Sequence, residues 1–189
     1  MKKAAMFGLD ARIALAIFGA LSVISGAALY SAIQEAKVTQ AVTIFTEVTK
    51  AIESYALDTG TIPGPANSSF LMDMGLLVSD TKSGWSGPYI SLKTLNYSSI
   101  CTDCTLEISA FDTFLAGRLF LSDTDGFTLC STGANCSFWI HYENMPLDFA
   151  KSMDERIDGT LDENKGKLRY SPSSPVNIWY NTGLSVGQF

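Results

Sequence analysis

The segment from Ile13 to Ile33 contains no charged residue and leads without interruption into an amphipathic pattern. A helix of that length spans roughly 31 Å, close to the hydrocarbon thickness of a bilayer. Lys2 and Lys3 precede the segment and favour an orientation with the N-terminus in the cytoplasm. The segment therefore predicts a single membrane-length helix whose downstream end enters the rest of the protein directly.

Beyond Gln34 the apolar residues recur at steps of three and four, with charged residues at other positions. The apolar positions are Val38, Val42, Phe45, Val48, Ile52 and Tyr55. From Gln34 onward no proline or glycine interrupts the pattern before Gly60 and Pro63, which together indicate a helix end. We therefore expect one helix from Ile13 to Thr59, roughly 70 Å long, with its second half packed on a globular domain.

Two simpler interpretations of the apolar segment remain open. A signal peptide cut near Ala27 would divide a pattern that looks continuous, whereas a plain membrane anchor fits the hydropathy. Gly19 and Gly26 lie on nearly the same helical face, with Ser22 between them. Small residues in such positions let helices approach closely, although membrane helices also tolerate glycine without such a role.

The leader preceding this helix, residues 1–8, carries two lysines and ends in Gly8. It resembles the leader of type IV prepilins, which a membrane peptidase cuts after the glycine on the cytoplasmic side. The resemblance implies a mature chain that starts at Leu9. It also implies a single-pass inner-membrane protein, with its N-terminus in the cytoplasm, that later leaves the bilayer.

The resemblance implies partners as well. The subunit would form a homo-polymer, or a co-polymer with other pilins, and would meet a prepilin peptidase and an inner-membrane assembly platform. After assembly it would lie in an extracellular pilus or a periplasmic pseudopilus. The roles of such filaments include adhesion, motility, DNA uptake and secretion.

This chain departs from the family at one position near the mature N-terminus. Pilin-like proteins usually carry a glutamate as the fifth mature residue, where it is thought to attract the N-terminal amine of a neighbouring subunit. Ile13 occupies that position here, and Asp10 and Arg12 supply charges nearby. Asp10 is a candidate substitute for the glutamate, and the alternative is that both charges mark the cytoplasmic boundary of the helix.

Residues 60–189 are expected to form one α+β domain. Trp85, Gly87, Pro88 and Tyr89 form a segment that resembles major pseudopilins of type II secretion and related type IV pilins. Strands are predicted at 105–111, 118–122, 127–130, 137–142, 167–170 and 177–181, a hairpin turn at 123–126, and short helices at 71–77 and 147–157. The expected fold is pilin-like: a long N-terminal helix with a protruding hydrophobic half, packed on a small antiparallel sheet. The parts are the leader 1–8, the helix 9–59 and the domain 60–189.

The four cysteines are Cys101, Cys104, Cys130 and Cys136. All lie in the part expected outside the cytoplasm, where clustered cysteines form disulfides. Short loops favour pairing Cys101 with Cys104 and Cys130 with Cys136, and all three pairings remain open. The first pair also has the spacing of a redox dithiol. A membrane-anchored periplasmic thiol oxidoreductase, or an anchored binding domain, is therefore the alternative function.

Other chemistry has little support in the sequence. The net charge is −6 and the basic residues are scattered, which argues against a nucleic-acid-binding face. His141 is the only histidine, lies in a predicted strand and accompanies no nucleophile motif, so we expect no enzyme and no cofactor. Asp158, Asp162 and Asn164 offer closely spaced oxygens for calcium but lack the full pattern of an EF-hand loop. The predicted function is structural.

Overall fold

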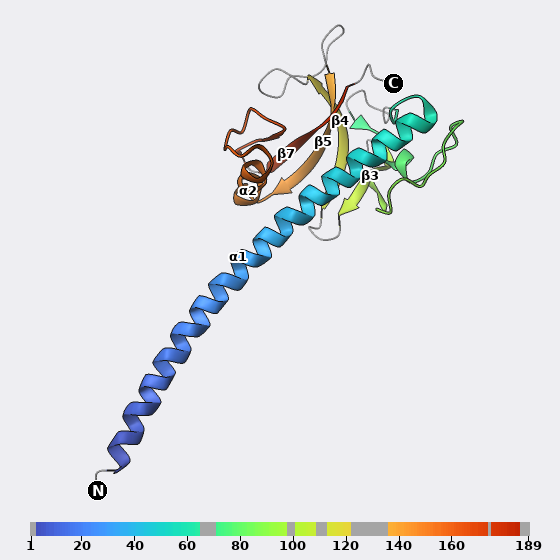
Figure 1. The fold of residues 1–189 in the computed structure, drawn as a ribbon. Coiled ribbons are helices and arrows are strands. Elements are labelled where there is room, and N and C mark those ends of the chain that lie inside the picture. Colours follow the sequence, from blue (N-terminus) through green and yellow to red (C-terminus); the bar gives the residue numbers. More distant parts are fainter. Residues whose placement is uncertain are drawn as a thin grey trace. The chain divides into compact units, whose positions relative to one another are not determined.

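A computed structural model of the chain describes residues 3–64, 71–97, 101–108, 113–121, 136–173 and 175–185 (Figure 1). The chain divides into two compact units, residues 1–40 and 41–189. A single helix, α1 (Lys3–Thr59), contributes to both units. Residues 41–59 of this helix belong to the second unit because their apolar side chains form part of its core.

The end of α1 lies at Thr59, as the sequence predicts, and the prediction of one helix through 13–59 is confirmed. Gly60 adopts a left-handed conformation with φ +72°, and its N–H donates to the carbonyl oxygen of Ala56 at 2.9 Å. This is the usual way for a glycine to end a helix. The start lies earlier than the predicted Ile13, because residues 4–6 of the leader are alanines and a methionine, which favour helix.

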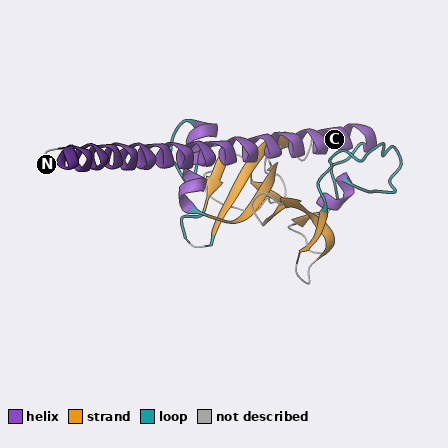
Figure 2. Ribbon diagram, turned by 90° about the horizontal axis from the view of Figure 1, so that it is seen from below, coloured by secondary structure: helices purple, strands orange, loops and turns teal. Residues whose placement is uncertain are grey.

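The described residues of the second unit include a seven-stranded sheet in which every pair is antiparallel (Figures 1 and 2). Its strands are β1 (Leu71–Met72), β2 (Thr94–Tyr97), β3 (Cys101–Ile108), β4 (Thr113–Leu121), β5 (Cys136–Met145), β6 (Leu168–Tyr170) and β7 (Val176–Ser185). The order is β2-β3-β4-β5-β7-β6, with β1 paired to β4. The chain therefore has an α+β fold with an antiparallel sheet, as predicted.

Most predicted elements are found close to their expected positions. Helix α2 (Leu147–Asp158) matches the helix predicted at 147–157. Strands β3 to β7 overlap the strands predicted at 105–111, 118–122, 137–142, 167–170 and 177–181, with ends that differ by a few residues. The helical turn expected at 71–77 is only partly correct, because β1 precedes a short 3₁₀ helix, η1 (Met74–Leu77). Strand β2 was not anticipated. The strand at 127–130 and the turn at 123–126 lie outside the described residues.

The core of the second unit lies between α1 and one face of the sheet (Figure 2). Phe45 of α1 stacks on Tyr180 of β7 with ring centroids 4.8 Å apart, and meets Tyr142 of β5 edge-on at 5.9 Å. Further along the helix, Val48 and Ile52 are completely buried. Burying each such side chain contributes roughly 1.5–3 kcal/mol, so this packing holds the second half of α1 on the sheet.

Candidate functional site

The first unit presents a continuous apolar helical surface. Its large exposed side chains are Leu9, Ile13, Leu15, Ile17, Phe18, Leu21, Val23, Ile24, Leu29, Tyr30 and Ile33. By length and composition the helix from Gly8 onward is suited to cross a membrane, with a mean hydropathy of 2.1 in its most apolar window. An exposed surface of this extent indicates that lipid or another protein covers it.

The residues predicted to act in processing and assembly all lie on this helix. Gly8 and Leu9, the expected cleavage position, are exposed. Asp10 and Arg12 are exposed as well. A methyl group placed on Gly19 or Gly26 would meet no atom within 4 Å, so both glycines leave open space beside the helix.

A second group of contacts fixes the C-terminal end of α1 to the loop after η1. Asp58 of α1 accepts hydrogen bonds from the hydroxyl groups of Tyr89, at 2.8 Å, and of Ser86. The bond from Ser86, followed by that from Tyr89, holds the pKa of the Asp58 carboxyl below its usual range. Trp85 donates from Nε1 to the carbonyl oxygen of Leu76 at 3.1 Å. The segment that contains Trp85 and Tyr89 is therefore held to the end of α1 through Asp58.

A buried tyrosine makes the second attachment between this loop and α1. The hydroxyl of Tyr55 donates to Asp80 at 2.6 Å, and its ring meets that of Tyr89 edge-on at 5.9 Å. Burial, followed by the hydrogen bond to Asp80, raises the pKa of Tyr55 above its ordinary value. Its buried surroundings and this bond keep the tyrosine neutral at physiological pH. Sequence periodicity placed Tyr55 in the core but gave no indication of its partner.

Acidic side chains of α2 hold the loop that leads to β6. Asp154 is fully buried and accepts a hydrogen bond from the backbone N–H of Asp162 at 2.9 Å. Asp158 accepts from the N–H groups of Lys167, at 3.0 Å, and Leu168, at 2.8 Å. A side chain at Gly166 would collide with the Asp158 carboxylate, so these bonds require the glycine. The role of Asp154 was missed, although its four-residue spacing from Asp158 is visible in the sequence.

The two carboxylates among the predicted calcium ligands accept hydrogen bonds from the backbone. Both oxygens of Asp158 accept from backbone amides, and Asp162 accepts from the N–H of Asn164 at 3.1 Å. Within the described part of the chain, no group of three or more His, Cys, Asp or Glu residues is arranged to hold a metal ion. The calcium site stays a prediction.

The first two cysteines lie in an irregular stretch of backbone. Tyr97 pairs with Cys101 and Leu95 with Thr105, so two residue steps on β2 face four on β3. Such a bulge bends the strand and increases its twist locally. A regular strand would separate the Cα atoms of Cys101 and Cys104 by about 10 Å, beyond the limit of about 6.8 Å for a disulfide. Cys130 lies outside the described residues, and all pairings, including that of Cys136, stay predictions.

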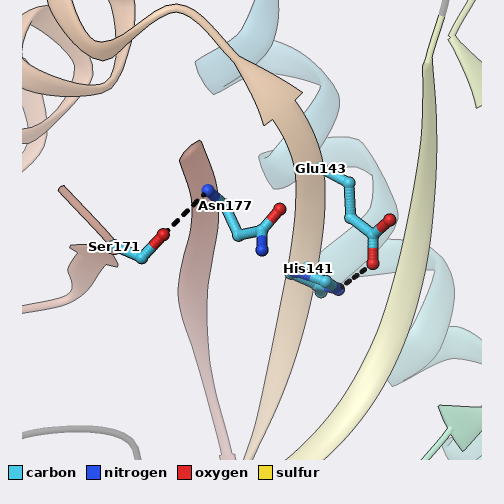
Figure 3. A network of polar contacts seen from close by, with 4 residues as sticks. All are labelled: His141, Glu143, Ser171 and Asn177. Atoms are coloured by element: carbon cyan, nitrogen blue, oxygen red, sulfur yellow. Dashed lines mark hydrogen bonds and ion pairs between the residues drawn. The ribbon is translucent and has the colours of Figure 1, made fainter. Parts of the chain in front are cut away.

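The only histidine belongs to the face of the sheet opposite α1. His141 of β5 is buried and stacks on Trp179 of β7, with ring centroids 5.0 Å apart, while its Nδ1 lies 3.3 Å from Glu143 (Figure 3). Nearby, the N–H of Asn177 donates to the hydroxyl of Ser171 at 3.3 Å. His141 is a packed sheet residue, as its position between two apolar strand residues predicts.

Comparison with known proteins identifies no relative. No family model, curated protein or solved structure matches the chain. Two features of the molecule therefore indicate a function: the exposed apolar half of α1, and the contacts that hold its other half in the globular unit.

Proposed function

We propose that this chain is a structural subunit of a type IV pilus or a type II secretion pseudopilus. It would be inserted in the inner membrane with its N-terminus in the cytoplasm and cleaved after Gly8 by a prepilin peptidase. An assembly platform would then polymerise it, alone or with other pilins, through the apolar segment 13–33. The globular unit, residues 41–189, would form the outer part of the filament.

One observation carries the proposal: a single helix is apolar on all sides in its first half and forms part of a globular core in its second. Residues 13–33 are exposed along the helix. Residues 41–59 continue the same helix and supply buried side chains to the sheet. A cleaved signal peptide has no reason to be continuous with a helix of the mature core, whereas a filament subunit with its apolar helix at the centre does.

The attachment of the helix end supports the same function. Asp58 and Tyr55 tie α1 to the loop that contains Trp85 and Tyr89. A firm joint of this kind would carry load between the helix in the filament centre and the outer domain. Removing the apolar segment from lipid requires an external motor, because a membrane helix does not leave the bilayer spontaneously.

N-terminal mass analysis of the protein isolated from the cells that make it tests the proposal. We expect a mature chain that begins at Leu9. The variant Gly8→Ala should remain unprocessed, because the peptidase recognises the glycine, while the matched variant Gly26→Ala should be cleaved normally. An intact leader, or a cut near Ala27, would contradict the proposal.

A further inference from the structure

The apolar half of α1 has two different sides. With 3.6 residues per turn, residues at steps of three and four follow one line along the helix. One line, here called the ridge, consists of Asp10, Ile13, Ile17, Leu21 and Ile24. The other, here called the groove, consists of Arg12, Leu15, Gly19, Ser22 and Gly26. The two lines lie about 180° apart around the helix axis.

The two lines are complementary in shape. The ridge carries four large aliphatic side chains, and all of them are exposed. The groove has open space beside Gly19 and Gly26, with Leu15 as its large residue. The hydroxyl of Ser22 donates to the carbonyl oxygen of Phe18 at 2.8 Å. Ser22 can therefore enter an apolar contact without leaving its hydroxyl unpaired.

The two lines are also complementary in charge. Asp10 and Arg12 are two residues apart, so they point to opposite sides of α1 and cannot face each other within one helix. At nearly the same height, the ridge therefore carries a negative charge and the groove a positive one. A charge next to apolar surroundings is costly unless it has a partner. Because the two cannot pair within one helix, an ion-pair partner for either of them would have to come from a second helix.

We propose that α1 packs in parallel against a second copy of this chain, with the ridge of one copy in the groove of the next. Asp10 of one copy then pairs with Arg12 of its neighbour. This inference rests on the proposed filament function and specifies its contact. A symmetric contact would bring Asp10 against Asp10, or Arg12 against Arg12, so the charges select head-to-tail packing. Such a contact leaves one ridge and one groove free at each step. Because the two lines lie on opposite sides of the helix, successive contacts do not turn back to the first copy, and the assembly stays open.

Charge exchange on the full-length chain tests the pair. Asp10→Arg and Arg12→Asp, each alone, place like charges together, and we expect each to reduce sedimentable polymer by at least about tenfold. The double variant Asp10→Arg/Arg12→Asp exchanges the two partners and should restore most of the polymer. Polymer is normalised to the amount of membrane-inserted protein, so an insertion defect does not count as an assembly defect.

The outcomes separate this contact from the proposed function. If the unmodified chain forms no polymer, the filament function is wrong and the contact with it. If it polymerises and the single reversals have no effect, Asp10 and Arg12 only mark the membrane boundary and the contact is wrong. Failure of the double variant to recover, with normal insertion, also overturns the pair.

Cross-linking provides an independent measurement of the packing geometry. Ile17→Cys places a thiol on the ridge and Gly19→Cys places one in the groove. When cells produce both variants together, mild oxidation should give a disulfide-linked dimer that joins positions 17 and 19, identified by peptide mass. Cells that produce either variant alone should give several-fold less dimer. Equal or greater cross-linking within either single variant would indicate a symmetric contact and overturn head-to-tail packing.

Discussion

The two halves of α1 belong to the same helix but meet opposite surroundings. Phe18 in the first half is 71% exposed, and Phe45 in the second half is 1% exposed. Both segments are rich in apolar residues, so composition does not account for the difference. The second half alternates apolar and charged residues at helical spacing, whereas the first half is apolar all round.

This contrast shows that the two halves depend on different kinds of partner. A helix with one apolar stripe needs only one apolar surface to pack on, and the sheet within residues 41–189 provides that surface. A helix that is apolar all round needs a partner on every side, which a small domain does not provide. Lipid or several copies of the same helix can. Matched substitutions in the two halves of α1 test this difference.

Truncating one phenylalanine in each half gives the largest expected difference. Phe45→Ala removes a ring that packs on Tyr142 and Tyr180 and should lower the free energy of unfolding by about 3–5 kcal/mol. Phe18→Ala, on the exposed half, should change it by less than about 0.5 kcal/mol. Urea unfolding of the detergent-solubilised chain, followed by tryptophan fluorescence, measures both, since all three tryptophans lie in the second unit. Equal losses would show that both halves belong to one cooperative core.

The pH dependence of the free energy of unfolding provides a second comparison, between one carboxylate in the globular unit and one on the first half of α1. Burial, together with the nearby carboxylates of Asp158 and Asp162, raises the pKa of Asp154 to about 6 from an ordinary 3.8. Between these values the folded chain holds a proton that the unfolded chain has lost. Stability from this group is therefore present at low pH and is lost as pH rises through that window, by about 2–3 kcal/mol.

The variant Asp154→Asn should remove this dependence and raise the free energy of unfolding at pH 7 relative to the unmodified chain. Its side-chain oxygen can still accept from the N–H of Asp162. Asp10→Asn, which removes an exposed carboxylate from the first half of α1, is the matched control for the substitution. Urea unfolding between pH 4 and pH 7 measures both variants. If the free energy of unfolding of Asp154→Asn falls with pH as steeply as that of the unmodified chain, groups other than Asp154 cause the dependence.

Sequence patterns predicted the elements whose signal is local. The end of α1 was predicted correctly because Gly60 and Pro63 are strong stop signals, and α2 because its apolar spacing is regular. Strand β2 was missed because pairing with β3, rather than its own composition, makes residues 94–97 a strand. The same dependence on a partner explains why β1 was assigned to a helical turn.

The features of the candidate site also differ in whether the sequence predicts them. The apolar segment, the leader and the charges at Asp10 and Arg12 are all visible in the sequence, because each is a property of consecutive residues. The bonds from Tyr55 to Asp80 and from Tyr89 to Asp58 join residues far apart in the chain. No periodicity encodes such pairs, so they emerge only once the loop is folded against the helix.

Glycines provide a third matched test. Gly84 adopts φ +90°, and a side chain there would collide with the carbonyl oxygen of Asp58. Gly84→Ala should therefore lower the free energy of unfolding by about 1–3 kcal/mol. Gly26→Ala, in the open first half, should leave unfolding of the globular unit unchanged, since it meets no atom within 4 Å. Urea unfolding measures both, and a loss at Gly26 as large as that at Gly84 would mean that residues 8–33 contribute to the same core.

Removing one tyrosine hydroxyl group from each half of α1 gives the smallest expected difference in the free energy of unfolding. Tyr55→Phe removes the hydroxyl that donates to Asp80 and should cost about 1–2 kcal/mol, because the acceptor is a carboxylate in a part-buried site. The loss is limited, since Asp80 keeps its hydrogen bonds from the N–H groups of Thr81 and Lys82. Tyr30→Phe makes the same change on the exposed half, where the ring is 66% exposed, and should cost nothing measurable. If the double variant Tyr55→Phe/Asp80→Ala loses less stability than the two single variants added together, the hydroxyl acts through that carboxylate. A fully additive double variant would instead show that the two side chains stabilise the joint independently.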